Sequence, residues 1–215
     1  MGILGRDFYI GDTVSIARAM VGRILVRRLG KENLICRITE TEAYVGSVDK
    51  ACHAYDYRKT RRNSTMFGPP GHAYIYLIYG MHCCLNFVTN PEGEPDAVLL
   101  RGLTPLNGTE TMARRRFGRS AAEFTSYQKK NFLNGPGKCC QALALDTSMD
   151  GMDLIGGDLF LCDSPQDAGL SPLHEPSFTV EAGRRIGIDY AEEAADFLWR
   201  FTWQPINTDK EHSLC

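Results

Sequence analysis

The chain has 215 residues, of which 43% are hydrophobic and 23% charged, and its formal net charge is −2. This size and composition predict one globular domain, residues 1–215, and no apolar run approaches the roughly 18 residues that a membrane span needs. The charge balance excludes a uniformly basic surface, so any nucleic-acid contact has to be local.

The first part of the chain predicts a helix and then a β-hairpin. Asp12 is a typical helix N-cap, apolar residues follow it at helical spacing, and Gly22 marks the end. Residues 23–29 and 34–44 are predicted strands, joined by a turn at 30–33. At a period of two, one face of the second strand holds Leu34, Cys36, Ile38, Glu40, Glu42 and Tyr44.

The polar end of that face, with Glu40, Glu42 and Tyr44, has two interpretations. It is typical of a strand that leaves the core and runs into a pocket, where a partly solvated carboxylate has a raised pKa that suits a general base. It also fits a strand end whose glutamates face water or pair with arginines, because structural ion pairs perturb pKa values too. The pattern alone favours the second, structural interpretation.

The middle of the chain predicts a long loop and a second hairpin. Residues 46–70 form a polar connection of about 25 residues, a length at which loops are usually functional. Residues 73–79 and 83–89 are predicted to pair as strands around a tip at 80–82. Another strand is predicted at 96–101.

The remainder of the chain predicts shorter elements. Helices are expected at 107–116, 121–132, 138–145 and 190–195, and strands at 158–162, 178–188 and 197–203. Strands joined by hairpins, with helices on one side, indicate an α+β domain with a curved, mostly antiparallel sheet, surrounding helices and a protruding β-hairpin. Residues 207–215 are expected to form a mobile tail.

The eight cysteines raise the question of disulfides or a metal site. No Cys-x-x-Cys occurs, and 83–84 and 139–140 are adjacent pairs, so free, buried thiols in a reduced, intracellular protein are expected. No glycine-rich phosphate-binding motif is present, and we predict neither a cofactor nor a metal. A Cys/His metalloenzyme stays as an alternative because His82 precedes the first cysteine pair.

Several separated motifs follow one another in a recognisable order. They are Glu-Thr-Glu-Ala-Tyr at 40–44 with His53, Arg62-Asn63 with Met66-Phe67, the aromatic segment 74–81, Asn86, Leu-Leu-Arg at 99–101, and Gly-Pro-Gly-Lys at 135–138. Together they resemble the alkyladenine (3-methyladenine) DNA glycosylase family, over nearly the whole chain. The resemblance implies the same α+β fold and a monofunctional enzyme that removes 3-methyladenine, 7-methylguanine and hypoxanthine from duplex DNA.

An enzyme that acts on a base in duplex DNA must first take that base out of the stack. Tyr79, with Met81 beside it, is the candidate wedge, because a large side chain at a hairpin tip can enter the minor groove and unstack a base step. The alternative is a tyrosine packed on its own hairpin. In the family that the chain resembles, the matching tyrosine intercalates.

Tyr44, His53 and Tyr76 are the candidate pocket, since aromatic stacking contributes about 1–3 kcal/mol per base and a cation–π term favours cationic alkylpurines. The resemblance implies that Tyr44 on one side, and His53 with Tyr76 on the other, sandwich the base, with Ala51 also in the pocket. A core role for Tyr76 is the alternative. The resemblance also implies that Asn86 excludes the 2-amino group of guanine, because an unpaired, desolvated donor is costly; the alternative is a turn-facing residue.

Glu42 is the candidate general base for an attacking water, and its charge would stabilise an oxocarbenium-like transition state. Arg101 would hold that water and keep Glu42 ionised, or it forms an ion pair with Glu40. The resemblance adds the backbone carbonyl of Ile186 as a third contact to the water. No lysine is placed to form a Schiff base, which indicates a monofunctional enzyme.

Contacts to the DNA backbone are expected from Arg58, Thr60 and Arg62 in the long loop and from Lys138 at the glycine-rich turn, although each of these charges also fits a solvated surface. The expected partner is duplex DNA with damaged purines, bound by a monomer in the compartment that holds the DNA. The rival from another class is a non-catalytic DNA-damage or RNA binder, which needs Tyr79 and the arginines but not Glu42.

Overall fold

The computed structural model describes residues 2–172 and 177–206, so the tail expected at 207–215 lies outside the described part. Its helices are α1 (Thr13–Met20), α2 (Thr109–Phe117), α3 (Ser126–Lys130) and α4 (Pro136–Ala142). Its strands are β1 (Ile24–Leu29), β2 (Glu32–Tyr44), β3 (Ala73–Ile78), β4 (His82–Thr89), β5 (Asp96–Asn107), β6 (Leu159–Cys162), β7 (Phe178–Gly183) and β8 (Arg200–Pro205).

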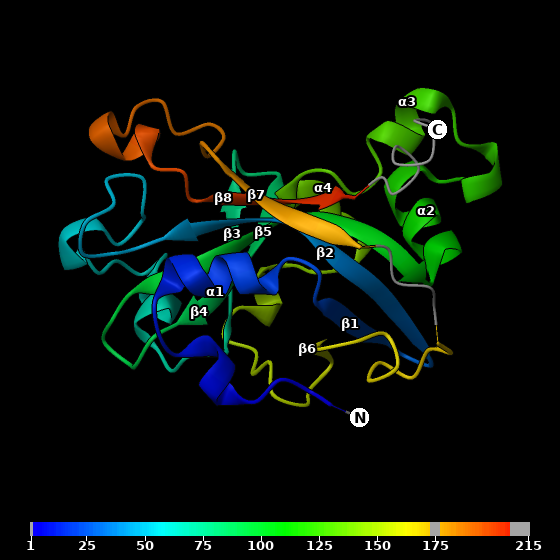
Figure 1. Cartoon of the computed structure of the whole chain (residues 1–215), viewed down its shortest axis with the longest axis horizontal. Coiled ribbons are helices and arrows are strands. Elements are labelled where there is room, and N and C mark those ends of the chain that lie inside the picture. The colour runs from blue at the N-terminus through cyan, green and yellow to red at the C-terminus, as the bar shows by residue number, and fades with distance from the viewer. Residues whose placement is uncertain (1, 173–176, 207–215) are drawn as a thin grey trace, which may run out of the picture.

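All eight strands belong to one antiparallel sheet, which confirms the predicted α+β class (Figure 1). The spatial order is β3-β4-β5-β2-β1-β6, and β8 pairs with the end of β2 and with β7. Figure 1 shows α2 and α3 at one end of the molecule and the segment between β7 and β8 at the other. No helix in the described ranges is long and apolar enough to cross a membrane.

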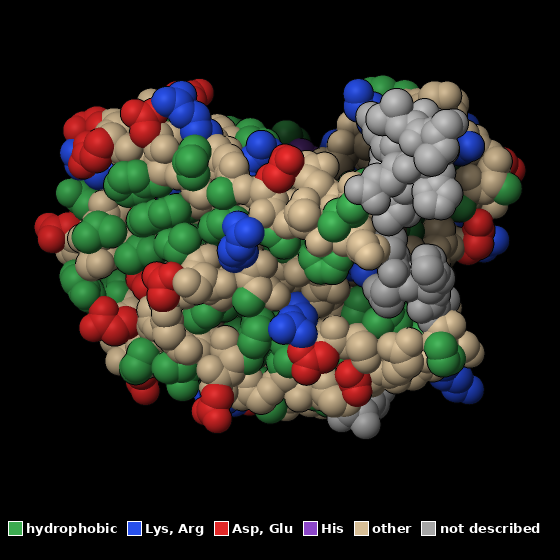
Figure 2. Space-filling model, in the orientation of Figure 1, with side chains coloured by type: hydrophobic (Ala, Val, Ile, Leu, Met, Phe, Trp, Pro, Cys, Tyr) green, Lys and Arg blue, Asp and Glu red, His purple; other side chains and the backbone are tan. Residues whose placement is uncertain are grey.

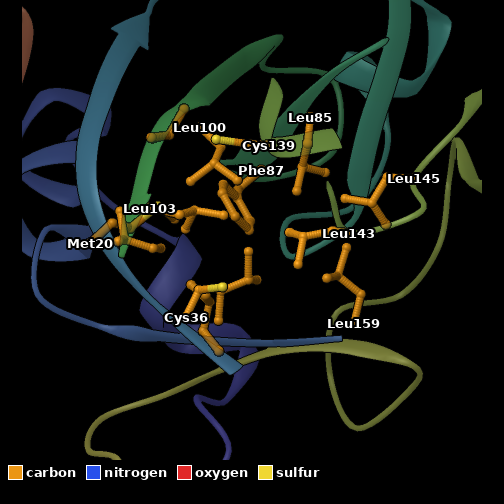
Figure 3. Close-up of a cluster of buried hydrophobic side chains, with 14 of the residues drawn as sticks. Met20, Cys36, Leu85, Phe87, Leu100, Leu103, Cys139, Leu143, Leu145 and Leu159 are labelled. Atoms are coloured by element: carbon orange, nitrogen blue, oxygen red, sulfur yellow. The ribbon is translucent and has the colours of Figure 1, made fainter. Parts of the chain in front are cut away.

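The main core lies between this sheet and the helices α1, α2 and α4, all of which contribute buried side chains. α1 begins as predicted, because the Asp12 carboxylate accepts a hydrogen bond from the Ser15 N–H at 2.9 Å, and its apolar side enters the core. Figure 3 shows Phe87 and Leu100 of the strands gathered in this core with Cys139 of α4.

Another surface of β3, β4 and β5 is covered by the long connection at 46–70. Its buried residues Cys52, Ala54 and Met66 pack against Tyr74 of β3 and Val88 of β4. The connection is therefore a packed wall, held by its own apolar residues, and it borders the cavity described below.

The prediction that one face of β2 runs from Leu34 to Tyr44 is wrong, because β2 and β5 change register three times, once between Ile35 and Cys36 and twice more between Ile38 and Thr41. Ile38 pairs with Leu103 and Glu40 with Gly102, which leaves Thr39 as an extra residue on β2. Such a bulge moves the following side chains to the opposite face.

The third irregularity gives β5 an extra residue, Arg101, because Thr41 pairs with Leu100. Beyond the bulges Thr41 and Ala43 take the core side: the Thr41 hydroxyl donates to the Ala17 carbonyl at 2.7 Å, and Ala43 joins the main core. The intervening Glu42 therefore points away from the core.

Gly102 makes this crossing of β2 and β5 possible. A Cβ at this position would lie 2.9 Å from both the Glu40 Cβ and the Thr39 Oγ1. A side chain there would push the two strands apart at the bulge.

Several predicted elements differ from the observed ones, and β5 continues to Asn107 although the predicted strand ends at 101. The helix expected at 121–132 is interrupted: one 3-10 turn covers Ala121–Glu123, and Thr125 then caps α3. The strand expected at 178–188 ends at Gly183, and the helix expected at 190–195 is a 3-10 turn at Glu192–Asp196. Each of the last three segments packs irregular backbone against the body, which local propensity does not encode.

Candidate active site

A cavity of about 130 Å³ lies where the end of β2, the β3–β4 hairpin and the segment after β7 meet. Of the residues predicted for the site, the following line it: Tyr44, Ala51, His53, Tyr76, Asn86, Arg101 and Ile186. They come from β2, the connection at 46–70, β3, β4, β5 and the segment after β7. The cavity combines aromatic walls with a few polar groups, as small-molecule sites usually do.

The aromatic wall on the hairpin side consists of His53, Tyr74 and Tyr76. The His53 and Tyr76 rings lie 4.5 Å apart at 73°, and the Tyr74 hydroxyl is 3.0 Å from Nδ1 of His53. Desolvation, with a smaller contribution from nearby Arg62, lowers the pKa of His53. The imidazole is therefore neutral at physiological pH and acts as a ring wall with one hydrogen-bonded nitrogen.

Glu42 lies behind this cavity and is fully buried. Its carboxylate accepts hydrogen bonds from the Tyr44 hydroxyl at 2.8 Å, the Ile186 N–H at 2.8 Å and the Arg101 guanidinium at 3.3 Å. Burial raises the pKa of Glu42, and these three donors, with Arg101 the largest, oppose that rise. Glu42 itself is not among the lining residues, but all three donors are.

Arg101 contacts both candidate carboxylates. Its Nε lies 3.2 Å from Glu40 and 3.3 Å from Glu42, so the ion pair with Glu40 and the contact with Glu42 exist together. Although burial opposes its charge, the carboxylates of Glu42 and Glu40 keep the pKa of Arg101 above its ordinary value. The β5 bulge is what turns this side chain toward the cavity.

Ile186 reaches Glu42 with its N–H, a contact that the sequence did not suggest. The segment that holds Ile186 is anchored by Arg185, a residue missed at the sequence level. Its guanidinium pairs with Asp49 at 2.5 and 2.7 Å, and both side chains are fully buried. The same guanidinium donates to the Ala43 and Ala194 carbonyls, which ties the segment to the end of β2.

The tip of the β3–β4 hairpin projects into solvent. Tyr79 is 84% exposed and Met81 is 74% exposed, so Tyr79 is not packed on its own hairpin. Tyr79 and Gly80 both adopt positive φ angles, 52° and 68°, in the tight connection between the strands. Such a conformation is strained for a tyrosine, and it sets this side chain at the extremity of the turn.

The four residues expected at the DNA backbone have different surroundings. Arg58 and Arg62 are exposed, whereas the Thr60 hydroxyl is bonded to Asn63 at 3.0 Å. The Lys138 ammonium is partly buried and donates to two asparagine side chains at 2.8 and 2.9 Å. Figure 2 shows basic and acidic side chains interspersed on the face drawn, in keeping with the charge balance.

The alternative of a metal centre finds no support in the described ranges. No group of three or more His, Cys, Asp and Glu residues gathers there with the geometry of a metal site. The cysteines at 36, 52, 83, 84, 139, 140 and 162 are unbridged, and all but Cys83 are buried.

An aromatic cavity with a buried carboxylate behind it, beside an exposed hairpin tip, is the arrangement expected of an enzyme that acts on a flat ring such as a nucleobase. The model of the methylpurine-DNA glycosylase (MPG) family matches residues 7–206. The chain therefore belongs to the methylpurine-DNA glycosylase family, and the predicted resemblance is confirmed. Because enzymes of this family hydrolyse N-glycosyl bonds, the prediction of a glycosylase is confirmed as well.

Bacterial relatives match almost end to end. A protein of Clostridium perfringens (strain 13 / Type A) named "Putative 3-methyladenine DNA glycosylase" is 44% identical over 198 residues, which is 92% of this chain and 94% of the relative. A protein of the same name from Desulfitobacterium hafniense (strain Y51) is 43% identical, over 92% of this chain and 93% of the relative.

Proposed function

We propose that this protein removes damaged purines from duplex DNA by hydrolysing the N-glycosidic bond of a flipped nucleotide and leaving an abasic site. The observation that supports this most is the position of Glu42, whose carboxylate is bonded to three residues that line the aromatic cavity. The proposed substrates are 3-methyladenine, 7-methylguanine and hypoxanthine. The protein would act as a single-domain monomer, without a cofactor, in the compartment that holds the DNA.

In this proposal the flipped base stacks between Tyr44 and the pair of His53 and Tyr76. The glycosidic bond then lies toward the Glu42 side of the cavity, where a negative charge stabilises the developing oxocarbenium ion. An attacking water needs one acceptor position on Glu42. The contacts of Arg101 to Glu42 are the longest at 3.3 Å, so the water would displace one of them and hydrogen-bond to both groups.

The direct test is strand cleavage at a damaged base. Duplexes that contain one hypoxanthine or one 7-methylguanine are incubated with the protein and then treated at neutral pH with an abasic-site endonuclease, which breaks the strand only where a base has been removed. We expect cleavage at the lesion and none in an undamaged duplex. Stable binding to the lesion duplexes without any cleavage would instead identify a non-catalytic binder, and the proposal would be wrong.

Tyr79 is proposed to fill the gap that the flipped nucleotide leaves. Because unstacking a base step costs a few kcal/mol, Tyr79→Ala is expected to slow single-turnover excision from duplex DNA on the order of 30-fold. Excision from single-stranded DNA should change much less, since no stack has to be opened.

The matched control is Tyr127→Ala. Tyr127 is a similarly exposed tyrosine, at 73%, on α3 at the other end of the molecule from the segment between β7 and β8 (Figure 1). The Tyr127→Ala variant should excise the lesion at the wild-type rate. Equal losses on duplex and single-stranded DNA for Tyr79→Ala would rule out the wedge role.

Asn86 is proposed to exclude guanine. Its side-chain nitrogen donates to the Tyr74 and Cys84 carbonyls at 3.1 and 3.4 Å, which fixes the amide at the cavity wall. Asn86→Ser opens space there, so the ratio of hypoxanthine to guanine excision is expected to fall about tenfold. Asn107→Ser, at the exposed end of β5, should leave the ratio unchanged, and an unchanged ratio for both variants would refute this role.

A further inference from the structure

Both tyrosine walls of the cavity have an arginine guanidinium stacked on them. The guanidinium carbon of Arg185 lies 4.7 Å from the centre of the Tyr44 ring, and that of Arg62 lies 5.0 Å from the centre of the Tyr76 ring. Both rings line the cavity, whereas neither arginine does. Each guanidinium therefore contacts a cavity-wall ring without itself lining the cavity.

The two guanidinium groups differ in how their charge is compensated. Arg185 is neutralised by Asp49, which pairs with it through two short contacts in the fully buried interior. Arg62 has no ion pair with any residue in the described ranges. Its guanidinium is exposed and donates to the Leu77 carbonyl at 2.9 Å. Of the two, Arg62 is the one that presents an uncompensated positive charge behind a cavity wall.

Arg62 also has a defined place on the far side of its ring. It borders a shallow hollow formed with Ile75, Leu77 and Thr147, and Tyr76 lines both this hollow and the base cavity. Tyr76 is thus a single aromatic layer with a cation on one side and the substrate space on the other.

We propose that Arg62 is a specificity-determining residue, which acts through the Tyr76 ring to favour neutral damaged purines over cationic alkylated ones. An aromatic face attracts a cation through the negative face of its quadrupole, and a guanidinium already stacked on the opposite face competes for that electron density. Like-charge repulsion across the ring adds to the effect. The inference rests on the proposed function, because it concerns which bases that cavity accepts.

The charge of Arg62 also affects His53, which lines the same cavity as Tyr76. Burial and, second to it, the charge of Arg62 lower the pKa of His53, whose ring is 4.5 Å from that of Tyr76. A positive charge on this wall is therefore disfavoured. The aromatic walls alone predict a preference for cationic purines, and Arg62 opposes that preference.

The test compares one neutral and one cationic lesion. Single-turnover excision of hypoxanthine and of 7-methylguanine is measured for the wild type and for Arg62→Met, which keeps the length of the side chain and removes its charge. Because Arg62 is exposed and its charge is screened, we expect the 7-methylguanine to hypoxanthine rate ratio to rise about fivefold. Arg62→Lys keeps the charge and should remain within about twofold of the wild-type ratio.

Arg61→Met is the matched control, since Arg61 is an exposed neighbour that does not line the cavity and stacks on no aromatic ring in the part of the chain that the structure describes. It should lower both rates together, if at all, and leave their ratio unchanged. An unchanged ratio in Arg62→Met, with both rates reduced by the same factor, would assign Arg62 to the DNA backbone and overturn the proposal.

Binding separates a failure of this inference from a failure of the proposed function. The dissociation constants of the two lesion duplexes are measured for Glu42→Gln with and without Arg62→Met, so that no chemistry is required. A preference for the neutral lesion that weakens about fivefold with Arg62→Met supports the inference even if the protein releases no base. Equal dissociation constants for the two lesions in both proteins would refute it even if excision occurs.

Discussion

Glu42→Gln is expected to abolish base release while the protein still binds a lesion duplex. A carboxylate that activates water and faces a developing positive charge commonly contributes a rate factor on the order of 10³, and glutamine provides neither the charge nor the basicity. The substitution keeps the side-chain volume, and an amide oxygen still accepts from the Ile186 N–H. The new NH2 group faces the Arg101 guanidinium, however, so one contact between two donors replaces a charge-assisted hydrogen bond.

The measurement is single-turnover excision of hypoxanthine, with binding followed separately by fluorescence anisotropy. Glu40→Gln is the matched control, because Glu40 also pairs with Arg101, at 3.2 Å, and with Arg200, at 3.1 Å. It is expected to lose at most about tenfold in rate, as for an ion pair with some solvent access. Near wild-type excision by Glu42→Gln would refute the assignment of the base.

Asp49→Asn is expected to destabilise the fold by about 3–5 kcal/mol, the usual cost of leaving one charge of a buried pair without its partner. Asp49 and Arg185 are both fully buried, and Arg185 also holds the Ala43 and Ala194 carbonyls. The loss is measured as the shift in the urea unfolding midpoint at constant slope. Because Arg185 precedes Ile186, excision should also fall in the fraction that stays folded.

A solvent-exposed pair in the same region provides the control. Lys50 contacts Glu192 and Glu193 at 2.6 and 2.9 Å, and Glu193→Gln should leave the unfolding midpoint nearly unchanged. The double variant Asp49→Leu/Arg185→Met removes both charges together. If burial of an unpaired charge causes the loss, this double variant is more stable than Asp49→Asn, and the opposite order would contradict the explanation.

Short stretches of sequence predict much of the candidate site, because residues close together on one strand or turn have a fixed spatial relation to each other. The β3–β4 hairpin and its tip were predicted from alternation and from Gly80, and the tip is as exposed as expected. The pairing of Tyr44 with Glu42 is local too, since residues two apart on a strand share a face.

The face of β2 could not be predicted by extending that alternation. The extra residue Thr39 transfers Glu42 and Tyr44 from the core side of β2 to the cavity side, and the extra residue Arg101 on β5 then restores the register between the two strands. A bulge depends on how two distant strands meet, and its one local trace is Gly102, where a side chain would collide with β2.

The residues of this chain specify, on their own, which side chains are suited to stacking, acid–base chemistry and wedging, because those properties belong to the residue types and their local spacing. Only the tertiary structure decides that the Ile186 N–H meets Glu42 and that Arg185 meets Asp49, 136 positions away in sequence. The physical reason is that such contacts satisfy buried charges and backbone donors, and their partners are set by packing between distant segments, for which the sequence has no periodic signal.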